Sequence, residues 1–183
     1  MPGGGYGYKS GTSMAAPHVS GVAALIWSYF PNKTAQEIRQ VLEASAEDLG
    51  PRGRDNDFGY GLVRADLAYN FLNGFRGELL PDMQVFSQNR KYRLKFQLDG
   101  NLVLYDQANR PLWASNTRGI QPGKAVMQRD GNFVVYDNAG RARFATGTHG
   151  RPGSYLRVEN DGNLVIYSRG GTPIYDRYNG KLY

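Results

Sequence analysis

The chain has 183 residues, a net charge of +6 and no cysteine. Its length allows one or two small domains, and the lack of cysteine excludes a disulfide framework or a thiol-ligated metal site. No apolar run reaches 18 residues, so we expect no membrane-spanning helix. No basic segment followed by an apolar run stands at the start, so we expect no signal peptide in this sequence.

The positive charge is concentrated in one part of the chain. Residues 1–77 contain as many acidic as basic side chains, so the whole excess falls on residues 78–183. A basic surface with aromatic residues could bind nucleic acid. The basic residues are scattered rather than clustered, so we favour an ordinary solvated surface and expect no nucleic-acid partner. The excess could instead favour anionic glycans or cell walls.

Helices are predicted for the first third of the chain. Residues 13–26 are rich in alanine and apolar on nearly every side, which predicts a helix buried in a larger body. Thr34-Ala-Gln-Glu37 is a capping box and predicts the start of a second helix. Its inward stripe would be Ile38, Val41 and Leu42. A third, short helix is expected to end near Asn73.

The start of the first helix carries a recognisable motif, Gly11-Thr-Ser13-Met-Ala-Ala-Pro-His18-Val. Read alone, Ser13 is an N-cap. The motif resembles the active-site serine segment of the subtilisin-like serine proteases (subtilases). That resemblance implies that Ser13 is a nucleophile. His18 lies five residues along the same helix and cannot comfortably reach Ser13, so we interpret it as structural.

The subtilase resemblance covers about residues 1–74, the last third or less of such a domain. In that family, the aspartate and the histidine base of the triad lie upstream of the serine. A nucleophile without its base is weak, and losing triad members costs orders of magnitude in rate. We therefore expect this chain alone to be inactive as a protease.

A nine-residue phrase occurs three times, beginning at positions 97, 128 and 159. Self-similarity at a fixed period of 31 residues indicates a repeat architecture. Each copy contains Asp-Gly between alternating apolar segments, which predicts a β-hairpin. The residues expected to face the core are Leu94, Phe96, Leu102 and Leu104, then Ala125, Met127, Phe133 and Val135, then Leu156, Val158, Leu164 and Ile166.

The opposite face of each hairpin carries the candidate binding residues. Amides, carboxylates and phenols together donate and accept hydrogen bonds, as sugar hydroxyls require, and a valine offers an aliphatic surface. Turn chemistry alone could explain Asp-Gly-Asn, but not the recurrence of the other types. The candidates are Gln97, Asp99, Asn101, Val103 and Tyr105; Gln128, Asp130, Asn132, Val134 and Tyr136; and Glu159, Asp161, Asn163, Val165 and Tyr167.

The phrase resembles the Q-x-D-x-N-x-V-x-Y signature of the bulb-type (monocot mannose-binding) lectins, over about residues 78–183. The resemblance implies a β-prism of three antiparallel sheets, one per repeat. It also implies binding of mannose-type glycans without a metal or cofactor, and a possible homo-oligomer through this domain. Copy three departs at Glu159, which has no N–H to donate. Trp113, Phe144 and Tyr175 are expected to be core aromatics.

The sequence thus predicts a mainly β protein: a β-prism preceded by a short α-helical segment that resembles the end of an α/β subtilase domain. The expected parts are residues 1–74, a junction at 75–83 and a lectin domain at 84–183. The leading hypothesis is carbohydrate binding. One alternative is a full-length, secreted serine endopeptidase with Ser13 as its nucleophile and the lectin as a targeting module. Another is a prism that binds no glycan.

Overall fold

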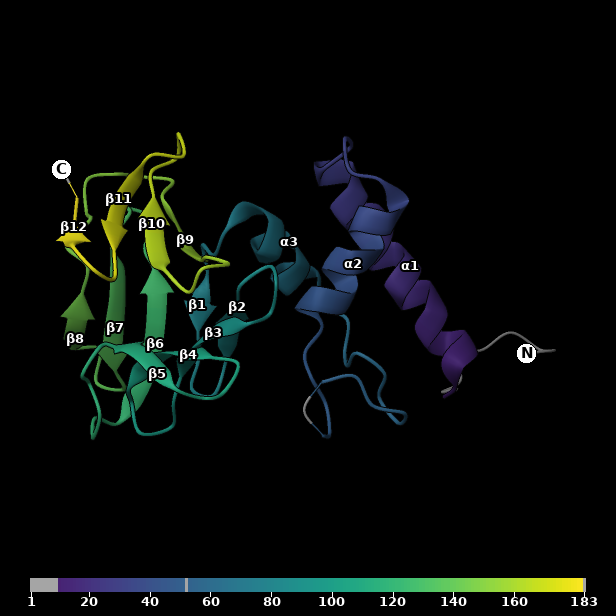
Figure 1. The fold of residues 1–183 in the computed structure, drawn as a ribbon, viewed down its shortest axis with the longest axis horizontal. Helices are drawn as coiled ribbons and strands as arrows, with labels where there is room; N and C mark the ends of the chain where they lie inside the picture. Colours follow the sequence, from purple (N-terminus) through teal and green to yellow (C-terminus); the bar gives the residue numbers. More distant parts are fainter. Residues whose placement is uncertain (1–9, 52, 183) are drawn as a thin grey trace, which may run out of the picture. The chain divides into compact units, whose positions relative to one another are not determined.

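The computed structural model describes residues 10–51 and 53–182. The chain divides into two compact units, residues 1–69 and 70–183, and each is considered by itself (Figure 1). The first unit contains α1 (Thr12–Tyr29), α2 (Ala35–Ser45) and the start of α3 (Ala65–Asn73). These three helices were predicted.

The capping box at the start of α2 is formed as predicted. Thr34 Oγ1 accepts a hydrogen bond from the backbone N–H of Glu37 at 3.2 Å, and the Glu37 carboxylate accepts one from the Thr34 N–H at 2.9 Å. These bonds satisfy two donors that a helix start otherwise leaves free. The predicted inward residues Ile38, Val41 and Leu42 are all buried.

Helix α1 differs from the prediction. It was expected to be buried, yet Ile26 is its only buried residue. Met14, Val19, Leu25, Trp27 and Tyr29 are exposed. The described elements of this unit are helices and isolated β-bridges, so no sheet covers the apolar sides of α1.

The second unit consists of three four-stranded antiparallel sheets, as predicted (Figure 1). One sheet has the order β2-β3-β4-β5, the next β1-β6-β7-β8 and the last β12-β11-β10-β9. The strands are β1 (Glu78–Leu79), β2 (Gln84–Phe86), β3 (Tyr92–Phe96), β4 (Leu102–Asp106), β5 (Pro111–Ala114), β6 (Pro122–Met127), β7 (Phe133–Asp137), β8 (Ala142–Ala145), β9 (Tyr155–Val158), β10 (Leu164–Tyr167), β11 (Pro173–Asp176) and β12 (Gly180–Lys181).

The core of this unit is formed by the inward faces of the three hairpins. All twelve residues predicted to face inward are buried. Leu94 pairs with Leu104 and Phe96 with Leu102, so both strands of the first hairpin point apolar side chains to the same side. Of the predicted core aromatics, Tyr175 is buried in the core, whereas Trp113 and Phe144 are half-buried and pack against it.

Residues 75–83, which the sequence suggested as a junction, are part of this unit. Phe75 and Leu79 are buried in its core. Phe75 forms a bridge with Leu156, and β1 pairs with β6. The second sheet therefore takes its edge strand from the segment that precedes the repeats.

The turn of each repeat packs against the loop that leads into the next repeat. At the second turn, a Cβ on Gly131 would lie 2.1 Å from the backbone oxygen of Arg151, so only glycine fits. The Arg151 N–H also donates to the carbonyl oxygen of Asp130 at 2.8 Å. The third turn packs against the segment that leads into the first repeat, because Asn160 forms hydrogen bonds with Asn89, which precedes β3. These contacts fix the position of each motif turn.

Candidate functional site

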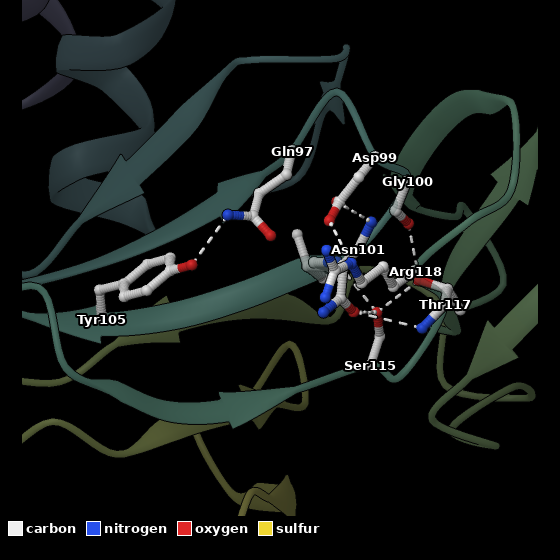
Figure 2. A network of polar contacts seen from close by, with 9 residues as sticks. Gln97, Asp99, Gly100, Asn101, Tyr105, Ser115, Thr117 and Arg118 are labelled. Carbon is white, nitrogen blue, oxygen red and sulfur yellow. Dashed lines mark hydrogen bonds and ion pairs between the residues drawn. The ribbon is translucent and has the colours of Figure 1, made fainter.

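The first motif copy brings Gln97 and Tyr105 together across the outer face of its hairpin (Figure 2). Gln97 Nε2 donates a hydrogen bond to Tyr105 Oη at 2.8 Å. The phenol oxygen therefore serves as an acceptor within the protein, and its own O–H is left to donate outward. The Gln97 carbonyl oxygen is likewise left to accept.

The turn of the first copy fixes Asp99 and Asn101. Asp99 Oδ1 accepts the Asn101 backbone N–H at 3.0 Å, so one carboxylate oxygen has the turn role considered from the sequence. Asn101 Oδ1 accepts bonds from the Thr117 N–H and Ser115 Oγ, both at 3.2 Å (Figure 2). With the amide oxygen occupied, the NH₂ group of Asn101 is the donor available to a ligand.

The second copy repeats this arrangement. Gln128 Nε2 donates to Tyr136 Oη at 2.7 Å. Asp130 Oδ1 accepts the Asn132 N–H at 3.0 Å. Asn132 Oδ1 accepts bonds from the Thr148 N–H at 3.1 Å and from Thr146 Oγ1 at 3.2 Å. Copies one and two therefore present matching glutamine, tyrosine and asparagine groups. They differ at the carboxylate, because Asp99 Oδ2 also lies 3.4 Å from Arg118 Nε (Figure 2), whereas His149 stands at the equivalent position in copy two.

The third copy reverses the direction of one hydrogen bond. Because Glu159 cannot donate, Tyr167 Oη donates to Glu159 Oε1 at 2.8 Å. Burial, and then the bond to Glu159, raise the pKa of Tyr167 to about 12. The Tyr167 O–H thus donates to the Glu159 carboxylate and is not available to a ligand. This copy therefore presents hydrogen-bond acceptors at the position where the other two copies present a tyrosine O–H donor.

Asn163, in the same copy, lacks the hydrogen bonds that hold the motif asparagine in the other two copies. Arg177 and Asn179 stand where copy two has Thr146 and Thr148. Arg177 is used elsewhere, since its Nη1 donates to the Leu112 carbonyl oxygen at 2.8 Å. Asn163 Oδ1 is buried without a hydrogen-bond partner among the described residues. Such an orphaned acceptor is costly, and the orientation of the amide is not fixed as it is in the other copies.

Comparison with known proteins gives different relatives for the two units. The subtilase family model matches residues 1–61. An extracellular serine protease of Serratia marcescens is 54% identical over 66 residues, which are 36% of this chain and 6% of that protein. Fervidolysin of Fervidobacterium pennivorans is 53% identical over 66 residues, again 36% of this chain and 9% of that protein. The chain thus spans less than a tenth of either protease.

The remainder of the chain resembles a solved lectin structure. A monomeric monocot mannose-binding lectin from Gastrodia elata matches with a TM-score of 0.50 and 36% identity, over 56% of this chain and 92% of that protein. The chain joins a subtilase segment to a domain of the bulb-type lectin family. Both resemblances noted in the sequence are confirmed.

The motif valines of the lectin domain are less accessible than their predicted role suggests. Val103 is 3% exposed, Val134 2% and Val165 5%. In copy one, the Gln97–Tyr105 bond spans the strand position that Val103 occupies, so these two side chains lie over it. The valines therefore offer a ligand little exposed aliphatic surface.

In the subtilase segment, Ser13 lies in the first turn of α1 and is exposed. His18 Nδ1 bonds to the Met14 carbonyl oxygen at 2.8 Å, which agrees with a structural role. Within residues 10–51 and 53–182, no hydrogen bond joins Ser13 to a histidine. The described part of the chain therefore shows the nucleophile's position without a base beside it.

Sequence reasoning missed the hydroxyl residues that support the motif asparagines. Ser115, Thr117, Thr146 and Thr148 are all buried, and Thr117 and Thr148 each donate to a turn glycine carbonyl at 2.7 Å. A signal was present, because Ser/Thr-x-Thr recurs 31 residues apart. It lies outside the nine-residue phrase, in the loops that follow β5 and β8.

Among the residues that the structure describes, no helix has the length and apolar character needed to cross a membrane. No group of three histidine, cysteine, aspartate or glutamate side chains in the same part of the chain is arranged to hold a metal ion.

Proposed function

We propose that the lectin domain binds mannose-type glycans through motif copies one and two, named site 1 and site 2, and more weakly through copy three, named site 3. The observation that carries the proposal is the matched polarity of the first two copies. Each combines a tyrosine O–H and an asparagine NH₂ as donors with a glutamine oxygen and a carboxylate as acceptors.

This combination suits a pyranose ring. Neighbouring sugar hydroxyls each donate and accept, so a site needs both kinds of partner within a few ångströms. Hydrogen bonds to a carboxylate are stronger than neutral ones, which gives Asp99 and Asp130 a large share of the affinity. The supporting bonds from Ser115 and Thr117 hold Asn101 in place before the ligand arrives, which lowers the entropic cost of binding.

Each site is shallow and small, so we expect weak binding by a single site. Useful strength would come from several sites engaging one branched or clustered glycan, since linkage raises the effective concentration. Homo-oligomerisation through the lectin domain would add more sites. Sedimentation of the purified chain with and without a multivalent mannan would test that step.

The test of the proposal is a double substitution in each site. Gln97→Ala with Asn101→Ala should abolish mannose binding at site 1 and leave site 2 intact. Gln128→Ala with Asn132→Ala is the matched control and should do the reverse. NMR titration resolves the sites through their turn amide signals. If either double variant binds mannose at the altered site like the wild-type chain, the assignment of site residues is wrong.

For the subtilase segment, we propose that this chain by itself does not cleave peptide bonds. The support is the lack of a histidine bonded to Ser13 in the described residues. A protein in which the segment is part of a complete serine protease would use Ser13 as nucleophile and the lectin domain as a targeting module. The extracellular relative in Serratia marcescens supports secretion of such a parent.

A further inference from the structure

The three sites differ in the residue that lies directly across the sheet from the motif tyrosine. Arg93 pairs with Tyr105, Lys124 with Tyr136, and Tyr155 with Tyr167. Directly opposed residues of antiparallel strands point to the same side of the sheet. This residue therefore decides whether one face of the motif tyrosine ring is covered or open.

At sites 1 and 3 the ring is covered. The Arg93 guanidinium carbon lies 5.0 Å from the centroid of the Tyr105 ring, a cation–π distance. The rings of Tyr155 and Tyr167 are stacked, with centroids 5.3 Å apart and planes 21° from parallel. In both sites a side chain of the same sheet occupies the space beside the phenol.

At site 2 the charged end of the equivalent side chain, Lys124, pairs with an acidic residue on the neighbouring strand. Lys124 Nζ lies 2.6 Å from Glu78 Oε1 on β1, the strand contributed by the segment before the repeats. Among the described residues, no ring or cation contacts the face of Tyr136. The space beside it is a pocket of about 410 Å³, lined by Leu80, Gly123, Lys124, Tyr136, Asp137, Asn138 and Gly140.

The charged groups at this pocket are already paired within the protein. Leu80 is 52% exposed, and Gly123 and Gly140 bring no side chain into the space. The charge of Lys124 is balanced by Glu78. The Asp137 carboxylate is already bonded to Arg141 and Arg143. An aromatic ring beside a leucine is a surface on which the C–H face of a sugar ring packs well.

We propose that this pocket is a second subsite of site 2 that takes the next pyranose of a mannose-type oligosaccharide. Tyr136 belongs to both parts: its hydroxyl accepts a hydrogen bond from Gln128 in the motif site, and the same residue lines the pocket. A glycan that extends from the motif site along the Tyr136 side chain would enter the pocket. The inference rests on the proposed function, because the first sugar must occupy the motif site. It makes site 2 a disaccharide site and leaves site 1 a monosaccharide site.

The test compares methyl mannoside with mannobioses of each linkage on the full chain, by site-resolved NMR titration. For the best linkage, we expect the disaccharide to bind about tenfold more tightly than the monosaccharide at site 2, and about equally at site 1. Lys124→Arg combined with Glu78→Gln, which removes the acidic partner, should place a guanidinium over Tyr136, as Arg93 does over Tyr105, and remove this gain. Arg93→Lys is the matched control at site 1, and a folded chain is verified by the unchanged titration of the other sites.

The outcomes separate the subsite from the function on which it rests. If both sites bind the monosaccharide but gain equally from the disaccharide, or if the double variant Lys124→Arg with Glu78→Gln keeps the gain, the subsite is overturned alone. A Leu80→Ala variant should also reduce the gain, and its failure to do so would count against the pocket. If neither site binds the monosaccharide, the proposed function fails and the subsite fails with it.

Discussion

Replacing Glu159 with glutamine should convert site 3 toward the polarity of the other two sites. In the present chain, Tyr167 donates its proton to Glu159 at 2.8 Å. A glutamine would instead donate to the phenol oxygen, as Gln97 and Gln128 do at 2.8 and 2.7 Å. The Tyr167 O–H would then be free to bond a sugar hydroxyl.

The expected gain follows from one recovered hydrogen bond. A net contribution of about 0.5–1.5 kcal/mol corresponds to about two- to twelvefold tighter binding of mannose at site 3. Site 3 should remain weaker than site 1, because Asn163 still lacks the hydroxyl partners that hold Asn101. The reciprocal variant Gln128→Glu is the control and should weaken site 2 by a similar factor.

A second signal reports the same change without a ligand. The pKa of Tyr167, now about 12, should fall in Glu159→Gln because the bond to the carboxylate and its charge are both removed. It should stay above the ordinary value, since burial is the larger cause. NMR titration of tyrosine labelled at Cζ measures it. If the variant neither lowers this pKa nor tightens mannose binding, the polarity argument for site 3 is refuted.

Four further predictions concern the folded chain. Gly131→Ala should lower the free energy of unfolding of the lectin domain in urea by more than about 1–2 kcal/mol. Gly140→Ala is the control: a Cβ there meets nothing within 4 Å, so it should cost only the strain of a positive φ. Equal effects of the two substitutions would contradict the packing of the second turn. Phe96→Ala should cost about 3–5 kcal/mol in the same assay, since the ring is fully buried, and a cost below 1 kcal/mol would place the core elsewhere. Hydrogen bonds from Arg141 lower the pKa of Asp137 to about 2, below the ordinary 3.8. The ionised carboxylate therefore stabilises the fold fully above pH 3.8, and this stabilisation is lost as the pH falls toward 2. Asp137→Asn should make the urea midpoint of unfolding depend less on pH in that window. Ser13 should not react with a fluorophosphonate probe in this chain, and labelling that Ser13→Ala removes would show an assembled active site.

The hairpins and their core were predictable because two local signals agree. Asp-Gly fixes each turn, and strict alternation then assigns Leu94 and Phe96 to one face and Gln97 to the other. The capping box of α2 was predictable for the same reason, since Thr34 and Glu37 act within one turn of helix. Such features depend on neighbours in the sequence.

Other features depend on segments far apart, and the sequence did not reveal them. The pairing of Leu79 with Ala125 completes the second sheet from outside the repeats. The support of Asn101 by Thr117 crosses from one strand to the next loop. For α1, the apolar pattern predicts burial in a larger body, and that pattern alone does not show whether a covering sheet is present.

The Lys124–Glu78 pair is of this kind as well. From the sequence, Arg93 and Lys124 are equivalent basic residues of two repeats. Only the register of β1 against β6 shows that Lys124 has an acidic neighbour, which leaves the ring of Tyr136 uncovered.

The most direct test of carbohydrate binding is an NMR titration of the full chain with methyl mannoside, following the side-chain NH₂ signals of Asn101, Asn132 and Asn163. The account predicts that the signals of Asn101 and Asn132 shift with similar weak affinities, and that the signal of Asn163 responds only at higher concentration. Three equal responses would contradict the role given to Glu159. No response from Asn101 and Asn132 would contradict the proposal that the lectin domain binds mannose-type glycans through these motifs.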